Sequence, residues 1–451
     1  MDRALLLKTL LVAALAVALM LPVAMIRDLV AERQARRNVA VAGIAEGWGK
    51  AQIVAGPYLA IPYERHWTDV KRDMLDGKLR EVRTERSESQ VVRLPVADAA
   101  WTINADIGEK ARGIYKARLY SAKLEVQGTI ELPARARFED GTSRYKWGAP
   151  RLILGISDPL GIRAASDLSL GGAAYSLAPG SGDAAIAGGL HALLGELESA
   201  KAQKLAFSLI LELGGSEALS LAPLGADTSV SMRANWPHPS FQGRFLPAKH
   251  DIDAEGFNAS WTVSRFAAQG AAQVASCAFP CNRMGEQLSV SLIEPVGLYQ
   301  QLERASKYGY LFIGLTAAAF MLIELLRRLA IHPVQYTLVG LALAMFFLLL
   351  TALSEHIAFA HAYAIATGAC VGLISGYLTR VLRSALAGLA FGAALASLYA
   401  MLYALLKAED YSLLGGSLLL FGLLAVAMIA TRRIDWYALT GNRSLSGAQE
   451  A

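Results

Sequence analysis

The chain contains 451 residues, of which 54% are hydrophobic and 18% are charged, and its formal net charge is +5 at pH 7. This composition is too apolar for an ordinary soluble protein of this length, so much of the chain should lie in lipid. Because the arginines of the last third stand beside apolar runs, the positive charge indicates membrane orientation, and we expect no nucleic-acid partner.

The first apolar run covers residues 5–25 and is interrupted only by Lys8 and Thr9. At about 1.5 Å per residue, this run can cross a hydrocarbon core about 30 Å thick. A cleaved signal peptide is the competing interpretation, but its apolar region would be about 7 to 15 residues long and would end at small residues. The run therefore predicts an uncleaved anchor, and residues 28–45 predict a polar helical stalk after it.

The residues from 27 to 306 have ordinary polarity and are numerous enough for one large domain or two small ones. Short alternating or apolar runs between glycine and proline turns predict a mostly β, sandwich-like domain. Residues 184–204 are the exception, because apolar residues three and four apart predict one helix there. The predicted strands are residues 59–63, 116–130, 151–156, 205–213, 229–234 and 258–266.

A stiff segment of this domain contains Trp236, Pro237, His238 and Pro239, and Phe241 follows it. Each proline fixes its own φ and favours an extended conformation in the residue before it. The segment should therefore form a defined loop that either contacts a partner or shapes a turn between strands, and we favour the turn. Trp236, His238 and Phe241 are the candidate contact residues, although Phe241 is also expected in the sandwich core.

Three cysteines are too few for a disulfide scaffold. Cys277 and Cys281 would share an oxidising compartment if the domain is exported, and a local disulfide between them is compatible with their spacing. Cys370 lies in an apolar run, which indicates a small packed hydrophobic residue. The sequence lacks a paired metal-binding motif, so we expect neither a metal nor another cofactor.

Five more candidate spans follow and are joined by short connections. Arginines follow the first, third and fifth of them, whereas Glu355 follows the second and Glu409 with Asp410 follows the fourth. Positively charged short loops stay in the cytoplasm, so this alternation predicts that both termini are cytoplasmic. Four arginines after the anchor violate the rule locally. The five spans are residues 308–326, 334–353, 357–379, 384–406 and 412–430.

These segments predict four regions: residues 1–26 as the cytoplasmic N-terminus and anchor, 27–306 as a periplasmic β-rich domain, 307–431 as a five-helix transmembrane bundle, and 432–451 as a cytoplasmic tail. The predicted fold class is a membrane α-helical bundle of six transmembrane helices with a large, mostly β, sandwich-like periplasmic domain. The cytoplasmic parts are too small for a kinase or a DNA-binding module.

Four short runs have distinctive sequences. Residues 235–240 read NWPHPS, 332–336 read HPVQY, 354–356 read SEH and 434–437 read IDWY. Together with Gly56 and Pro57, they resemble, in a consistent order over nearly the whole chain, the CreD family of bacterial inner-membrane proteins. The resemblance implies an inner-membrane protein of Gram-negative bacteria that is linked to cell envelope integrity and to the response to envelope stress. It implies no catalytic residues.

Ionisable groups in or beside the predicted spans are candidate functional residues, because a charge in hydrocarbon is costly and usually faces a partner or a water-filled path. Glu324 and His332 lie at the predicted inner end, where Glu324 can pair with the two arginines that follow it. Glu355, His356 and His361 gather at the outer end, where they could share a metal or titrate near neutral pH. For both groups we favour a structural role.

The principal functional prediction is a non-enzymatic inner-membrane protein whose periplasmic domain contacts an unknown envelope protein, lipid or glycan, with the bilayer as its other partner. The sequence contains no nucleophile elbow, phosphate-binding loop or dinucleotide fingerprint. Transport or flipping of a lipid or envelope precursor is the alternative, with Glu324, His356 and His361 as the groups to test. A membrane-embedded hydrolase or transferase is the third.

Overall fold

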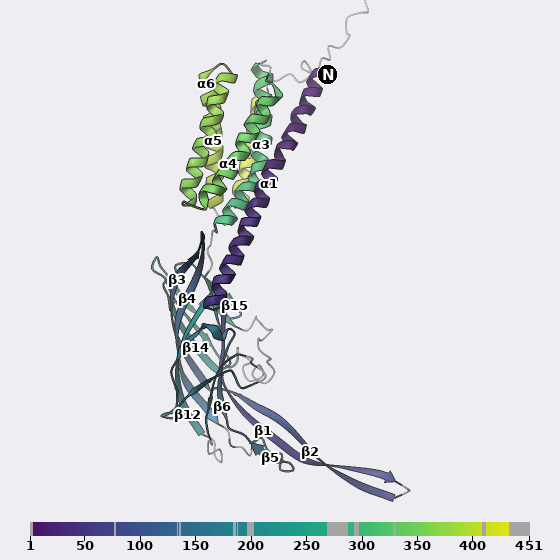
Figure 1. Cartoon of the computed structure of the whole chain (residues 1–451), viewed down its shortest axis with the longest axis vertical. Coiled ribbons are helices and arrows are strands. Elements are labelled where there is room, and N and C mark those ends of the chain that lie inside the picture. The colour runs from purple at the N-terminus through teal and green to yellow at the C-terminus, as the bar shows by residue number, and fades with distance from the viewer. Residues whose placement is uncertain are drawn as a thin grey trace, which may run out of the picture. The chain divides into compact units, whose positions relative to one another are not determined.

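The computed structural model describes residues 3–75, 78–132, 134, 137–183, 186, 188–195, 203–267, 287–292, 297–327, 331–407 and 412–432. The chain divides into two compact units. The helical unit comprises Met1–Asn38 and Pro295–Ala451, and the β unit comprises Val39–Glu294. Figure 1 shows helices in the first unit, and the strands in the second, which also includes the last residues of the first helix.

The helices have these bounds: α1 (Arg3–Trp48), α3 (Leu298–Arg327), α4 (Pro333–Ser354), α5 (Phe359–Val381), α6 (Ala385–Lys407) and α7 (Ser412–Thr431). The predicted anchor and helical stalk form one continuous helix, α1. In the described part of the chain, four helices are long and apolar enough to cross a membrane: α1, α4, α5 and α6. The prediction of an apolar membrane bundle is confirmed to this extent, and membrane crossing by α3 and α7 stays a prediction.

Buried aromatic rings pack together inside the helical unit. The ring of Tyr399 on α6 lies 4.9 Å from that of Phe312 on α3 and 4.3 Å from that of Phe346 on α4, measured between centroids. The hydroxyl of Tyr363 on α5 donates a hydrogen bond of 2.7 Å to the Tyr399 carbonyl. Close packing of this kind, together with hydrogen bonds between helices, is what holds helices together where lipid replaces water.

The described residues of the β unit form two nine-stranded sheets. The first has the order β10-β11-β6-β1-β13-β18-β15, with β2 and β5 paired to β1, and the second has the order β16-β17-β14-β3-β4-β12-β8-β9, with β7 paired to β12. The strands of the first sheet are β1 (Gln52–Leu75), β2 (Lys78–Pro95), β5 (Arg144–Trp147), β6 (Arg151–Ile156), β10 (Leu177–Pro179), β11 (Gly189–Leu193), β13 (Ala218–Ala222), β15 (Pro239–Gly243) and β18 (Leu288–Leu292). Those of the second are β3 (Asp98–Arg112), β4 (Tyr115–Leu132), β7 (Ile162–Ala165), β8 (Leu168–Leu170), β9 (Ala173–Tyr175), β12 (Gln203–Ser216), β14 (Asp227–Ala234), β16 (Lys249–Ile252) and β17 (Phe257–Val263).

One hydrophobic core lies between the two sheets. It includes Val54 and Ile156 from the first sheet and Trp101, Leu124 and Trp261 from the second. Buried and exposed side chains alternate along β14 and β17, as expected for strands with one face in a core. A mostly β, sandwich-like domain is therefore confirmed, and each of the six predicted strands coincides with an observed one.

The helix predicted over residues 184–204 is wrong where the structure describes that segment. Gly189–Leu193 forms strand β11, which pairs antiparallel with β6. Gly189 has a φ of +134°, and a Cβ there would collide with the Leu154 carbonyl oxygen, so the position requires glycine. Glycine also disfavours helix. Although the local spacing of apolar residues indicates a helix, the backbone groups of this segment instead form hydrogen bonds with the neighbouring strand.

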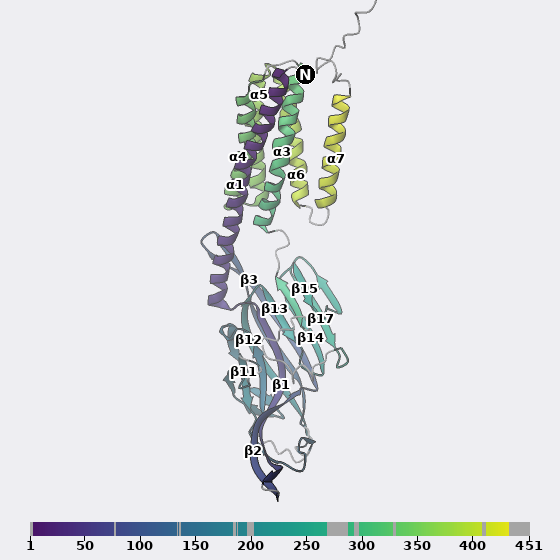
Figure 2. The same ribbon diagram turned by 90° about the vertical axis from the view of Figure 1, so that its right-hand side faces the viewer.

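Strand β1 is longer than the predicted strand at residues 59–63, and the sequence does not predict strand β2. Their pairing continues without interruption from Tyr58↔Pro95 to Leu75↔Lys78. The far part of this pair extends as a two-stranded ribbon beyond the rest of the β unit (Figures 1 and 2). Its residues are mostly charged or polar, so they lack the alternation of apolar residues by which a half-buried strand is recognised.

Candidate functional site

The segment that contains Trp236 and His238 connects β14 of the second sheet to β15 of the first. The Trp236 indole Nε1 donates a hydrogen bond of 2.8 Å to the His238 carbonyl oxygen, and the Arg118 guanidinium lies 4.4 Å from the centroid of the Trp236 ring. The His238 side chain is exposed. The segment is thus a turn held by Trp236, with His238 on its surface.

Phe241 has a different environment from the other two predicted contact residues. Its ring lies 5.7 Å from Phe257 and 5.8 Å from Trp261, both edge to face. It also lies 5.5 Å from His250. Phe241 packs against the core of the β unit, as expected from the sequence.

A polar groove with a volume of about 380 Å³ lies beside this turn. It follows one row of the second sheet, where Ala105 of β3, Ala234 of β14 and Phe257 of β17 are register partners. Three carboxylates, one guanidinium and three amides contribute to its lining. These side chains belong to Asp106, Asp253, Glu255, Arg233, Asn104, Asn235 and Asn258.

Two local networks hold the groove in shape. The Asn235 amide oxygen accepts a 2.6 Å hydrogen bond from the Ile107 amide, and its nitrogen donates a 2.7 Å bond to Asp106 Oδ1. Asp253 Oδ1 accepts hydrogen bonds of 2.8 Å from the amides of Glu255 and Gly256, which closes a tight turn. Asn235 opens the NWPHPS run, so the same run forms both the turn and one wall of the groove.

Sequence reasoning missed the acidic part of this groove. Asp106 lies 129 residues from its partner Asn235, and no local pattern indicates that they meet. The only local signal is the DAEG turn at residues 253–256. Carboxylates and amides bind hydroxyl and ammonium groups, so the groove can accept the polar part of a ligand.

At one end of α4, Glu324 and His332 have structural hydrogen bonds. Glu324 Oε2 accepts a 2.9 Å hydrogen bond from the Tyr336 hydroxyl, and Oε1 lies 3.4 Å from the Ile331 amide. His332 is the N-cap residue of α4, and its Nδ1 accepts from the Val334 amide at 3.3 Å. The expected pairing of Glu324 with the arginines that follow it involves side chains outside the described residues.

At the other end of α4, Glu355 connects three helices. Its carboxylate lies 3.6 Å from Arg33 of α1 and accepts a 3.2 Å hydrogen bond from the Tyr299 hydroxyl of α3. The Glu355 side chain is only 9% exposed. His356 and His361 are exposed instead. Among the described residues, no group of three or more His, Cys, Asp or Glu could hold a metal.

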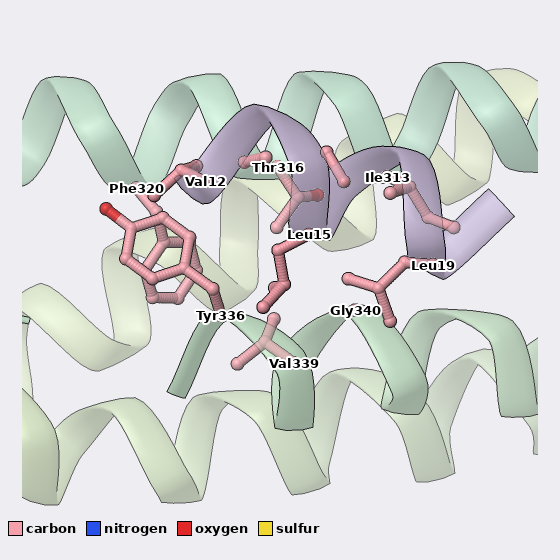
Figure 3. A pocket seen from close by; sticks show the side chains of 11 residues that line it. Val12, Leu15, Leu19, Ile313, Thr316, Phe320, Tyr336, Val339 and Gly340 are labelled. Atoms are coloured by element: carbon pink, nitrogen blue, oxygen red, sulfur yellow. The ribbon is translucent and has the colours of Figure 1, made fainter. Parts of the chain in front are cut away.

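A small apolar pocket lies between α1, α3 and α4, with Leu15 and Leu19 facing Val339 and Gly340 (Figure 3). Its volume of about 10 Å³ suffices for one water molecule at most. A Cβ added to Gly340 would meet a methyl group of Leu19, which shows how closely α1 and α4 approach. This part of the helical unit is too tightly packed to hold a lipid chain.

The cysteine predictions have two outcomes. Cys277 and Cys281 lie outside the described residues, so a disulfide between them stays a prediction. Cys370 is buried and free, with its Sγ 3.5 Å from the Ala342 carbonyl oxygen and 3.5 Å from the Tyr399 hydroxyl. The prediction of a packed residue at this position is confirmed.

Apolar helices together with a large β-rich domain define this chain as an integral membrane protein. The family described as inner membrane protein CreD matches residues 4–437. Inner membrane protein CreD of Escherichia coli (strain K12) is 33% identical to this chain over 423 residues, which cover 94% of this chain and 91% of that protein. The chain belongs to the CreD family of inner membrane proteins, so the resemblance noted in the sequence is confirmed.

One solved structure with a partial alignment to this chain shows only weak similarity. The M1 zinc metallopeptidase of Deinococcus radiodurans aligns with a TM-score of 0.20 and 10% identity, over 44% of this chain and 42% of that chain. A similarity this low carries no argument about fold or activity.

Proposed function

We propose that the protein supports cell envelope integrity and the response to envelope stress without enzymatic activity, and that its β unit contacts an envelope component in the periplasm. The polar groove beside the Trp236 turn carries this proposal. Its Asp106, Asn235 and Asp253 side chains are held by hydrogen bonds within the β unit, so this part of the groove is preorganised for a polar partner. A glycan, a lipid headgroup or a polar protein segment has the hydroxyl or ammonium groups that such a lining binds.

The proposed topology has six transmembrane helices, both termini in the cytoplasm and the β unit between the first and second spans. Residues 27–306 are then periplasmic and residues 432–451 form a cytoplasmic tail. Support comes from the four apolar helices and from the alternation of arginine and acidic connections. Arg33 departs from that alternation, and its ion pair with Glu355 offsets its charge locally.

The groove is tested by combining Asp106→Asn with Glu255→Gln, which removes two of its carboxylates while preserving side-chain size. With a photocrosslinking residue at the exposed His238, we expect at least a tenfold lower yield of the captured envelope component in intact cells, because two charge-assisted bonds are lost. The captured species is identified by mass spectrometry, and envelope function is scored by survival in detergent.

Asp251→Asn is the matched control, because Asp251 is an exposed acid on the neighbouring strand β16 and does not line the groove. It should leave capture and survival unchanged. Equal capture by the groove variant and the control, at equal protein abundance, would remove the groove from the proposal.

Transport of a lipid or envelope precursor is the alternative, and one observation favours it. The Glu324 carboxylate, bonded to the Tyr336 hydroxyl, is an ionisable group inside the helical unit, where such groups often serve proton or substrate movement. The small pocket between α1, α3 and α4 offers no path in that region.

Three variants distinguish the transport function from the contact role: His356→Ala, His361→Ala and Glu324→Gln. We expect each of these variants to retain full envelope function, because our proposal assigns Glu324 a hydrogen bond within the helical unit that glutamine can still accept. The measurement is complementation of a deletion strain, with protein abundance determined by immunoblot. Loss of function at normal abundance would favour transport over the contact role.

A further inference from the structure

The far part of the β1–β2 ribbon, residues 64–75 of β1 and 78–90 of β2, is here named the arm. Strand β5 pairs with β1 only over Tyr63–His66, at the base of the arm. Among the described strands, β2 pairs with β1 alone, so its outer edge presents backbone hydrogen-bonding groups to any added strand (Figures 1 and 2). A two-stranded ribbon is only marginally stable by itself, and a further strand would stabilise it.

The edge strand of the arm reads KLREVRTERSESQ over residues 78–90. Charged residues often protect an exposed edge from pairing. Here, however, the two residues that flank Thr84 have opposite charges, with Arg83 before it and Glu85 after it. Arg83 and Arg86 each form an exposed ion pair within the arm, Arg83 with Glu81 at 3.9 Å and Arg86 with Asp69 at 3.4 Å. Their side chains are 74% and 53% exposed, so a second molecule can reach them and share or replace these partners.

Two copies of β2 can pair antiparallel about a two-fold axis perpendicular to the sheet. Such an axis keeps each face of the sheet on the same side, so it passes midway between the two copies of one residue, which then stand directly opposite each other. Centred on Arg83, the pairing puts arginine opposite arginine and Glu81 opposite Glu85. Centred on Glu85, it puts two glutamates opposite each other. Like charges directly opposite each other destabilise both registers.

Centred on Thr84, the same pairing puts Arg83 opposite Glu85 twice, Glu81 opposite Ser87, and threonine opposite threonine. The sequence also places Arg80 opposite Glu88 in this register. Direct pairs of opposite charge and pairs of threonines are the favourable cross-strand pairs of antiparallel sheets. We propose that the arm is a homodimerisation element, in which β2 pairs with β2 of a second copy of this chain about Thr84.

The first test is disulfide capture with Thr84→Cys in intact membranes. Facing residues of an antiparallel pair have Cα atoms about 4.5–5.5 Å apart, which is within the range of a disulfide. With a mild oxidant, we expect most of the variant chain to migrate at twice the monomer mass. The unchanged chain, treated identically, measures any background from its own three cysteines.

Ser89→Cys is the matched control, because Ser89 is equally exposed on the same strand. In the proposed register the two copies of residue 89 lie about 33 Å apart, so this variant should remain monomeric under oxidation. Dimers from Ser89→Cys equal to those from Thr84→Cys would indicate random collision and would overturn the proposal. So would a Thr84→Cys chain that stays monomeric at normal abundance.

Charge exchange tests the register itself in the Thr84→Cys background. Arg83→Glu places glutamate opposite Glu85 in both symmetric pairs, and we expect roughly a tenfold decrease in crosslinked dimer. Adding Glu85→Arg restores two opposite-charge pairs and should restore the yield. Failure of the exchange to rescue would contradict pairing about Thr84, even where dimers form.

Discussion

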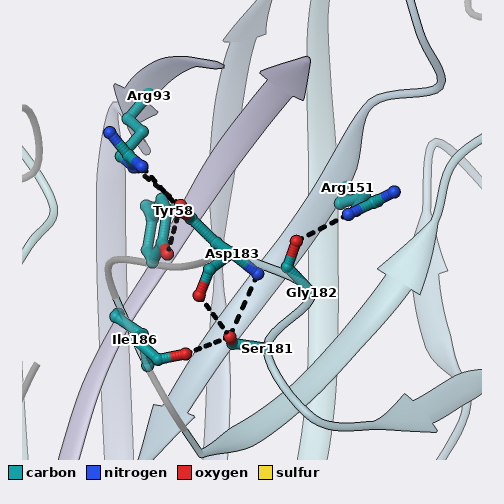
Figure 4. Close-up of polar contacts among 7 residues, drawn as sticks. All are labelled: Tyr58, Arg93, Arg151, Ser181, Gly182, Asp183 and Ile186. Atoms are coloured by element: carbon teal, nitrogen blue, oxygen red, sulfur yellow. Dashed lines mark hydrogen bonds and ion pairs between the residues drawn. The ribbon is translucent and has the colours of Figure 1, made fainter. Parts of the chain in front are cut away.

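Asp183→Ala should lower the free energy of unfolding of the β unit by about 3–5 kcal/mol. The Asp183 side chain is only 1% exposed, and that of its partner Arg93 is 20% exposed. The Asp183 carboxylate accepts hydrogen bonds from Arg93 Nε at 2.6 Å, from Arg93 Nη2 at 2.7 Å and from the Tyr58 hydroxyl at 3.0 Å (Figure 4). Removing the carboxylate leaves a largely buried guanidinium and a buried hydroxyl without their acceptor.

Tyr58 and Arg93, the two residues that donate to Asp183, both stay protonated, which supports the expected loss of stability. Burial, together with the charge of Asp183, raises the pKa of Tyr58 above its ordinary value. The hydrogen bond to Asp183 raises the pKa of Arg93. Both groups therefore stay protonated and continue to require an acceptor at every pH at which the protein functions.

Asp183 belongs to the connection between β10 and β11, where main-chain groups, Ser181 and Arg151 form further hydrogen bonds. Ser181 Oγ donates to the Asp183 carbonyl and lies within hydrogen-bond distance of the Ile186 carbonyl, and Arg151 donates a 2.6 Å bond to the Gly182 carbonyl. Figure 4 shows these contacts around the same short segment. These contacts do not use the Asp183 carboxylate, so the expected loss comes from the unpaired Arg93 and Tyr58 donors.

The measurement is chemical denaturation of the full-length protein in detergent, followed by tryptophan fluorescence. Asp69→Ala is the control, because Asp69 pairs with Arg86 at 3.4 Å on the exposed arm and should contribute at most about 1 kcal/mol. Combining Asp183→Ala with Arg93→Leu should recover part of the loss, because no unpaired charge then remains. A loss below 1 kcal/mol for Asp183→Ala alone would mean that water replaces the carboxylate.

Trp48→Ala should destabilise the β unit by about 3 kcal/mol. Trp48 ends α1, and two cations contact its ring: Lys110 Nζ is 3.7 Å and Arg163 Cζ is 4.4 Å from its centroid. Its indole nitrogen donates to the Tyr120 carbonyl at 3.2 Å, and Arg163 donates a 2.6 Å bond to its carbonyl. The substitution removes a large ring, two cation–π contacts and one hydrogen bond together.

Thermal unfolding of the full-length protein measures this loss, and two further variants identify its cause. Trp48→Phe keeps an aromatic face for both cations and should retain more than half of the contribution. Trp67→Ala removes a tryptophan from the arm, where Arg65 lies 5.2 Å from the ring, and should change stability by about 1 kcal/mol or less. If Trp48→Phe proved as unstable as Trp48→Ala, size and the indole hydrogen bond would be the dominant factors.

Several features follow from the sequence by itself. The apolar runs at residues 334–353, 357–379 and 384–406 predict α4, α5 and α6 to within a few residues, because a span of lipid requires a continuous run of apolar side chains. Alternation predicts β14 and β17, since each has one face in the core. The four short runs identify the family.

Tertiary structure decided the features that depend on partners distant in sequence. Gly189–Leu193 is a strand because β6 lies beside it, although its local spacing indicates a helix. Backbone hydrogen bonds between the two strands determine the long β1–β2 pairing. Many of its residues are charged, so the sequence shows no alternation of apolar residues there. Local periodicity contains no information about either partner.

The candidate sites show the same division. The sequence singles out Glu355 as a candidate, but it does not indicate its partners Arg33 and Tyr299, which come from helices far along the chain. It marks the run that begins at Asn235, but not Asp106, which completes the groove only when β3 and β14 pair. Residue type and periodicity therefore determined the membrane helices and the class of the β domain, whereas the groove and the buried ion pairs required folding to bring separated residues together.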